Sequence, residues 1–284
     1  MVSGPPDAPV SPSSRQERSR SLVELVGGVV GIALATLALS WLSAHVRWPI
    51  EDPLAARLAF VLAFAWVGLA SLTTASLARG HRATSLAIAG LLGVALLLTA
   101  ALSSNAIPSP VASSMVMAAL LLACSSAGAL VGARIQHAGH LGVVALVSSI
   151  ADLASVLGDQ GPSAQIAASA PTLSLLAIGG PMLGTPDLPP MLGAGDLVMI
   201  SLYAAAAHRF ALPERRTWVA LAAGVIGAMI AVLALERALP ALPFVGVAFV
   251  VAHPSTRLPP THERRTAALG VLVLAALALW LLAR

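Results

Sequence analysis

Two aspartates lie inside stretches of sequence that are otherwise uncharged and largely apolar. Asp196 interrupts the run from Leu188 to Ala207, and Asp152 interrupts the apolar run before it. A carboxylate in a bilayer-spanning helix costs at least ~2.5 kcal/mol on insertion scales, so such residues are rare and mark candidate functional sites. Two facing carboxylates would share a proton and titrate as a pair. One could then accept a proton from water while the other protonates a carbonyl, which is the chemistry of peptide-bond hydrolysis.

Glycines and prolines accompany the two acids. Gly193 and Gly195 precede Asp196, and we expect them to allow close backbone approach or a local break in the helix. Farther along, the run Ala238 to Ala252 would cover only ~22 Å as a helix. Because it begins with two prolines between 240 and 243, its first part is predicted to be non-helical backbone at membrane depth. Such backbone is tolerated where it is buried in protein or lines a wet cavity.

The composition identifies an integral membrane protein. Of 284 residues, 58% are apolar and 10% are charged, and the mean hydropathy is +0.89, which leaves too little polar surface for a soluble globule. All sixteen basic residues are arginines scattered between apolar runs, a distribution that reports topology and argues against nucleic-acid binding. The single Cys124 excludes a disulfide within the chain and a cysteine metal cluster, and we expect neither a metal nor a cofactor.

The elements that must position the acids are predicted to be transmembrane helices. We expect an all-α polytopic protein with about nine of them. We divide the chain into a disordered polar tail (1–20), a four-helix membrane region (21–140), a core with both acids (141–254), and a loop with an extra helix (255–284). The predicted helices are about 25–44, 57–78, 83–102, 111–132, 141–158, 191–210, 217–235, 238–252 and 266–282.

The connection between the two acid-bearing helices, 159–190, is long and contains five prolines before Pro190. We do not expect an ordinary helix there. Its apolar stretch Thr172 to Ile178 has only seven residues, which predicts a strand or a re-entrant piece at the membrane edge.

The arginines orient the nine-helix arrangement. With the N-terminus inside, twelve arginines fall on inner segments and four on outer ones, as the positive-inside rule requires. Asp152 then lies six residues before Gly158 and Asp196 six residues after Pro190, so each is ~9 Å below the outer boundary. We therefore expect a multi-pass protein with its N-terminus inside, and we assign it to a prokaryotic cytoplasmic membrane on the family resemblance described below. The inner arginines are Arg15, Arg18, Arg20, Arg79, Arg82, Arg134, Arg209, Arg215, Arg216, Arg257, Arg264 and Arg265; the outer ones are Arg47, Arg57, Arg237 and Arg284.

Three motifs between Leu141 and His253 carry a family resemblance. Gly193-Ala194-Gly195-Asp196 resembles the GxGD motif, and Pro240-Ala241-Leu242 the PAL motif, of the presenilin and signal peptide peptidase family. The segment Asp152 to Leu157, followed by Gly161-Pro162, resembles the family's first catalytic segment, and the order and spacing agree. The chain is thus similar to a prokaryotic-type intramembrane aspartyl protease.

The resemblance implies a presenilin-like arrangement around a catalytic pair. Asp152 and Asp196 would be the catalytic residues, and Pro240, Ala241 and Leu242 would shape the site and contact an extended substrate. The implied substrates are transmembrane or signal-peptide-like helices in the lipid bilayer. The chain departs from the family in having Ala151 where the family usually has tyrosine, four helices before the first acid instead of five, and an extra C-terminal helix.

Other functions fit parts of the pattern. A prepilin-type peptidase also uses a GxGD motif, but its usual lysine after the aspartate is missing here. A proton-coupled transporter can build an ion site from intramembrane acids beside broken helices. A structural scaffold gives no reason for two acids at matched depth. Tyr203 follows Asp196 by seven residues on the same helical face, where we expect packing instead of chemistry.

Overall fold

The computed structural model describes residues 21–102, 109–158, 161–186, 188–237 and 239–282. The predicted polar tail, 1–20, lies outside the described residues. Helices dominate, and the two short strands are β1 (Ala177–Gly179) and β2 (Pro190–Gly193). The helices are α1 (Leu22–His45), α2 (Pro53–Ala78), α3 (Ala83–Leu102), α4 (Ser109–Gly132), α5 (His140–Leu157), α6 (Pro162–Ala168), α7 (Ala170–Leu176), α8 (Ala194–Arg209), α9 (Glu214–Leu235), α10 (Leu242–Ala252) and α11 (Arg264–Leu282), with a short 3-10 turn η1 (Pro254–Thr256) after α10.

Six helices of the described residues are long and apolar enough to cross a bilayer: α1, α2, α3, α4, α5 and α9. The prediction of an α-helical membrane protein is therefore confirmed. Two of the helices that the sequence predicted to span the membrane are shorter than these six: α8 has 16 residues and α10 has 11.

Helix α4 is the most buried of the six and lies at the centre of the bundle, between α3 and α8. The close packing of α4 on α8 depends on glycine. A Cβ atom at Gly128 would lie 2.1 Å from the Val198 carbonyl oxygen, and one at Gly132 would lie 2.4 Å from that of Leu202. Small residues allow this backbone approach between membrane helices. The seam fixes the position of α8, the helix that carries Asp196.

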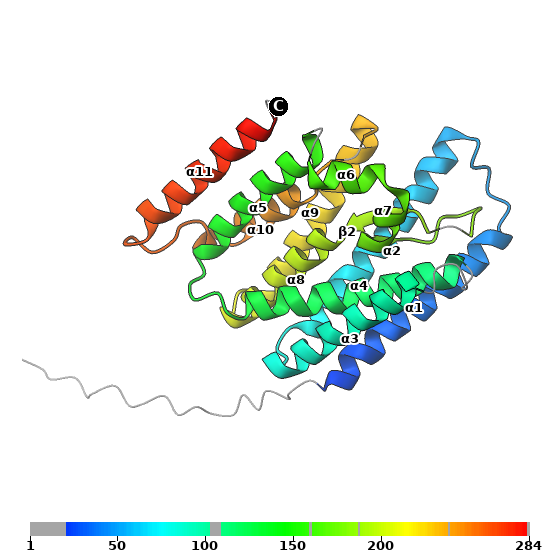
Figure 1. The fold of residues 1–284 in the computed structure, drawn as a ribbon, viewed down its shortest axis with the longest axis horizontal. Coiled ribbons are helices and arrows are strands. Elements are labelled where there is room, and N and C mark those ends of the chain that lie inside the picture. The colour runs from blue at the N-terminus through cyan, green and yellow to red at the C-terminus, as the bar shows by residue number, and fades with distance from the viewer. Residues whose placement is uncertain (1–20, 103–108, 159–160, 187, 238, 283–284) are drawn as a thin grey trace, which may run out of the picture.

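A second seam joins α5, α10 and α9, which lie side by side in Figure 1. A Cβ atom at Gly224 of α9 would lie 2.5 Å from the Cα atom of Val245 in α10. On the other side of α10, Gly246 packs against Ala145 of α5. Helix α11 packs on the outer side of α5 at one edge of the molecule (Figure 1).

The connection from 159 to 190 differs from the prediction. Most of the stretch expected to be a strand is helical, because α7 covers Ala170–Leu176 and only the next three residues form β1. A second short helix, α6, precedes it. The prolines explain the error: Pro162 and Pro171 each stand in the first turn of a helix, where proline's fixed φ is compatible and its missing N–H is not needed.

The start of the Asp196 helix was also predicted wrongly. The helix was expected from about Met191, but Pro190–Gly193 is strand β2 and α8 begins at Ala194. Strand β2 pairs antiparallel with β1, so that Ala177 lies opposite Gly193 and Ile178 opposite Leu192. Both Ile178 and Leu192 are buried, which anchors the hairpin on the bundle. Asp196 is consequently in the first turn of its helix instead of deep within it.

The loops at the two ends of the bundle differ in charge. At one end, Arg79 pairs with Glu214, Arg209 donates to the Ala133 carbonyl oxygen, and His140 pairs with Glu263. These contacts tie four loops together into what we call the arginine-rich end. At the opposite end, the Ser40 hydroxyl donates to the Pro186 carbonyl oxygen at 2.7 Å, and Arg57 lies 2.5 Å from Glu236. The arginine-rich end carries Arg79, Arg82, Arg134, Arg209, Arg215, Arg216, Arg257, Arg264 and Arg265.

Candidate active site

Asp196 is partly buried in the first turn of α8. Its Oδ2 atom accepts a hydrogen bond from the backbone N–H of Gly193 at 3.1 Å. An acid at the third helical position often reaches back in this way, and the helix dipole favours a negative charge there. Because Gly193 has no side chain, the reciprocal bond of a full capping box cannot form. Among the described residues, no hydrogen bond to the second carboxylate oxygen is found.

Asp152 is partly buried near the end of α5. Its Oδ2 atom accepts a hydrogen bond from the backbone N–H of Leu242 at 3.0 Å, across 90 residues of sequence. Leu242 is the first residue of α10, whose N-cap residue Ala241 provides no side-chain acceptor. Asp152 therefore caps α10 from another helix.

The two aspartates lie close enough for the charge of Asp152 to act on Asp196. Below them, Tyr203 of α8 faces Ser148, which is one helical turn before Asp152 on α5. The Tyr203 ring is buried and stacks on Phe249 of α10 with 4.6 Å between ring centroids, so its predicted packing role is confirmed. The structure thus brings α5, α8 and α10 together at the acids.

The segment Pro240-Ala241-Leu242, which resembles the PAL motif, also lies at the acids. Pro240 is buried, Ala241 is the N-cap of α10, and Leu242 supplies the N–H that binds Asp152. The expectation that α10 begins only after a non-helical first part is confirmed, since residues 239 to 241 precede the helix. Two helix N-termini, those of α8 and α10, therefore end at the acid pair.

For the two glycines before Asp196, the sequence predicted either close backbone approach or a local break in the helix. A Cβ atom at Gly193 would meet only Asp196 at 3.5 Å, and one at Gly195 would meet no atom within 4 Å. Close backbone approach is therefore not their purpose among the described residues. The predicted break in the helix does occur, because Gly193 is extended and α8 starts after it. Gly195 is exposed, so open space lies beside Asp196.

Ser155 was not singled out from the sequence. Its hydroxyl oxygen accepts from the backbone N–H of Ser163 at 2.9 Å, and it donates to the Ser163 hydroxyl at 2.7 Å. It thereby satisfies the start of α6, whose N-cap Gly161 has no side chain to do so. The available signal was a serine shortly before a Gly-Pro pair, which is too common to single out.

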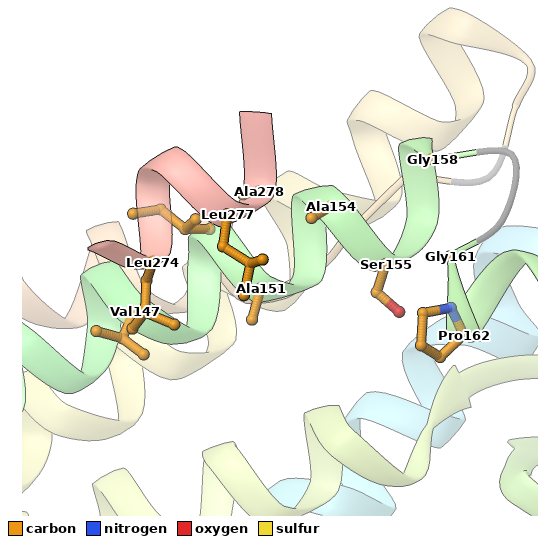
Figure 2. A pocket seen from close by; sticks show the side chains of 11 residues that line it. Val147, Ala151, Ala154, Ser155, Gly158, Gly161, Pro162, Leu274, Leu277 and Ala278 are labelled. Carbon is orange, nitrogen blue, oxygen red and sulfur yellow. The ribbon is translucent and has the colours of Figure 1, made fainter. Parts of the chain in front are cut away.

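An apolar cavity of about 370 Å³ lies on a different face of α5 from Asp152, between α5, the start of α6 and α11. Figure 2 shows Val147, Ala151 and Ala154 facing Leu274, Leu277 and Ala278, with the Ser155 hydroxyl near Pro162. Neither aspartate lines this cavity. It lies beside the contact of α11 with α5 and contributes no group to the acid pair.

Within the described part of the chain, no group of three or more His, Cys, Asp or Glu side chains is arranged to hold a metal ion. The groups that the described residues place at the candidate site are two carboxylates and the backbone N–H groups that they bind. Comparisons with protein-family models, with curated proteins and with solved structures found no match to this chain.

Proposed function

We propose that this protein is an intramembrane aspartyl protease of the presenilin and signal peptide peptidase type. In this proposal, nine helices (α1 to α5 and α8 to α11) cross the membrane, with the N-terminus and the arginine-rich end inside. Residues 141–254 form the catalytic core, and α11 is an addition to it. The protein cleaves transmembrane or signal-peptide-like helices in the outer part of a prokaryotic cytoplasmic membrane, with Asp152 and Asp196 as the catalytic residues.

One observation carries the proposal: Asp152 binds the N–H of Leu242 while its charge reaches Asp196. These residues belong to three sequence motifs of one protease family, and they come from three different helices. An arrangement that only packed helices would not require the three motifs to meet.

The proposed reaction needs one carboxylate ionised and one protonated. The ionised aspartate accepts a proton from water as the water oxygen attacks the peptide carbonyl carbon. The other aspartate donates its proton to the carbonyl oxygen, which gives a tetrahedral diol. Collapse of the diol breaks the C–N bond, and a carboxyl proton passes to the leaving amine. The helix N-termini of α8 and α10 stabilise the negative charge that remains on the pair.

The surroundings of the pair suit a peptide substrate. The open space beside Gly195 leaves room next to Asp196. Strand β2 leads directly into this region, and a two-stranded sheet has unpaired edges that can bind an extended peptide by backbone hydrogen bonds. Pairing of this kind would hold a substrate unwound, so that its scissile carbonyl is accessible.

A proton-coupled transporter is the second candidate, favoured by the short helices α8 and α10 whose N-termini reach the acids. Transporters build ion sites from broken helices in a similar way. A prepilin-type peptidase would share the acids but gives no role to the contact between Asp152 and Leu242.

The test uses purified full-length protein in liposomes with a synthetic transmembrane peptide. We expect peptide products, identified by mass spectrometry, that disappear when Asp152 or Asp196 is replaced by Asn. Proton-dependent solute uptake by the same liposomes without peptide cleavage would contradict the proposal and favour the transporter.

A further inference from the structure

A groove of about 630 Å³ runs between α9 and α10 on the surface of the bundle. Its mouth is formed by Arg215 and Arg216 in the first turn of α9. Its walls are apolar and small, and they include Val219 and Ala223 of α9 and Ala248 and Val251 of α10. The groove closes deeper in the membrane, where Gly224 packs directly on the backbone of Val245.

The charge at the mouth is uncompensated. Among the residues that the structure describes, neither Arg215 nor Arg216 forms a salt bridge. The neighbouring acid Glu214 is bound instead by Arg79 and by the indole N–H of Trp218. Burial and the Arg216 guanidinium both lower the pKa of His253, which shows that the charge of Arg216 acts on its surroundings.

A third arginine adds to this charge. The guanidinium of Arg257 lies 3.4 Å from the Val251 carbonyl oxygen, at the end of α10 that borders the mouth. The groove thus combines a cationic mouth at the arginine-rich end with an apolar channel along two membrane helices. No carboxylate is among its lining residues.

We propose that this groove binds one anionic phospholipid, with the phosphate on Arg215 and Arg216 and an acyl chain along Val219, Ala223 and Ala248. Arginine binds phosphate oxygens with two parallel N–H groups, and basic pockets between membrane helices on the inner face hold anionic lipid head groups. A free phosphate ion would use the mouth but would leave the apolar channel without a role. The proposal does not depend on protease activity.

The chain offers matched controls for a test. Arg264 and Arg265 are a second exposed arginine pair at a helix start on the same end of the bundle, outside the groove. Ala234 is an exposed alanine of α9 that does not line the groove, unlike Ala223. The paired variants are therefore R215Q/R216Q against R264Q/R265Q, and A223L against A234L.

Full-length protein in mild detergent is titrated with dioctanoyl phosphatidylglycerol or the phosphatidylcholine of equal chain length, and bound lipid is counted by native mass spectrometry. We expect one phosphatidylglycerol, with at least tenfold preference over phosphatidylcholine. R215Q/R216Q should weaken binding at least tenfold, and A223L at least fivefold, while both control variants change it less than twofold.

Several results would overturn the proposal. Equal binding of the two lipids, or equal loss in R264Q/R265Q, would mean that only general charge attraction is present. Complete competition by millimolar inorganic phosphate with no effect of A223L would mean that an ion occupies the mouth and no lipid occupies the channel. If R215Q/R216Q does not fold, A223L still tests the proposal, because this variant keeps every charge and changes only the apolar channel. Unchanged phosphatidylglycerol binding in A223L would then overturn the proposal.

Discussion

The first four helices and the segment from α5 to α10 provide hydrogen-bond partners for their polar groups in different ways. In α1 and α2 the backbone is continuous, and three polar side chains bond to their own helix: Thr36, Ser71 and Thr74 each donate to the carbonyl oxygen four residues earlier. Beyond their first turns, α1 to α4 contain no acidic residue. Bonds of this kind keep polar groups paired within a helix, as the bilayer requires.

In the second region the helices are interrupted. The breaks before α8 and α10 leave N–H groups at Gly193 and Leu242 without helical partners, and these two groups bind the carboxylates of Asp196 and Asp152. In this region, the helix starts that follow the breaks and the partly buried acids therefore stabilise each other. The acids satisfy the helix starts, and the helix starts stabilise the acids, so capping and catalysis must be separated by experiment.

The largest effect is expected from removing the charge while keeping the cap. Asn caps helices about as well as Asp, so D152N and D196N should fold and insert normally. We expect each to reduce peptide cleavage by at least ~10²-fold, the lower end of what general acid–base catalysis contributes. The control is D52N in the first region, where Asp52 caps α2 through the Leu54 N–H. Retained cleavage in D152N or D196N would leave the acids with a capping role only.

A bulky residue beside Asp196 tests the open space of the second region. Since a Cβ at Gly195 meets no atom within 4 Å, G195L should not lower the melting temperature. It should reduce cleavage about tenfold if the substrate occupies that space, because misplacement near the reacting atoms is costly. G31L in α1, where a Cβ also meets nothing, is the control. Equal activity of the two variants would place the substrate elsewhere.

Gly224 of α9, which packs on α10, and Gly93 of α3, which packs on α4, can be compared at similar steric cost. An added Cβ lies 2.5 Å from Val245 in G224A and 2.6 Å from the Ala123 nitrogen in G93A. Each should lose ~1–3 kcal/mol of stability through overpacking. Only G224A moves α10, which carries the N–H that binds Asp152, so we expect it alone to lower kcat severalfold. Thermal unfolding followed by cleavage kinetics below the transition measures both. Equal losses of kcat in G224A and G93A would contradict a specific role of the α9 and α10 seam in positioning Asp152.

The smallest effect is expected at Ser155. S155A removes the acceptor for the Ser163 N–H at the start of α6 and should cost ~1 kcal/mol, the usual value of a lost helix cap. S71A in α2 removes a hydroxyl that bonds only to its own helix, so we expect a smaller change there. Hydrogen exchange at the amides of α6 reports the difference. Unchanged exchange in S155A would show that α6 does not need this cap.

The lengths of the uncharged apolar runs predicted the long helices well, because hydrophobic length alone sets them. The bounds of α3 agree with the predicted run 83–102, and α4 ends at Gly132 as expected. The sequence also predicted that the run Ala238 to Ala252 would begin with non-helical backbone, because the run is short and starts with prolines, and α10 indeed begins at Leu242. These features depend on local composition and on the thickness of the bilayer.

The connection and the start of α8 were predicted poorly because their structure depends on tertiary contacts. Pro162 begins α6 instead of breaking a helix, and Leu192 lies in a strand because Ile178 of β1 pairs with it. The candidate site was expected from the depth of Asp152 and Asp196, but depth contains no information on contact. The bond from Leu242 to Asp152 could not be derived from spacing, since it joins residues 90 positions apart.

The most direct test of the central claim is labelling with a photoreactive transition-state mimic of aspartic proteases, whose hydroxyl group takes the place of the attacking water. The full-length protein in liposomes should be labelled in the wild type and in D52N, and labelling should be lost in both D152N and D196N. Labelling that persists at wild-type level in either of the last two variants would contradict a shared catalytic pair.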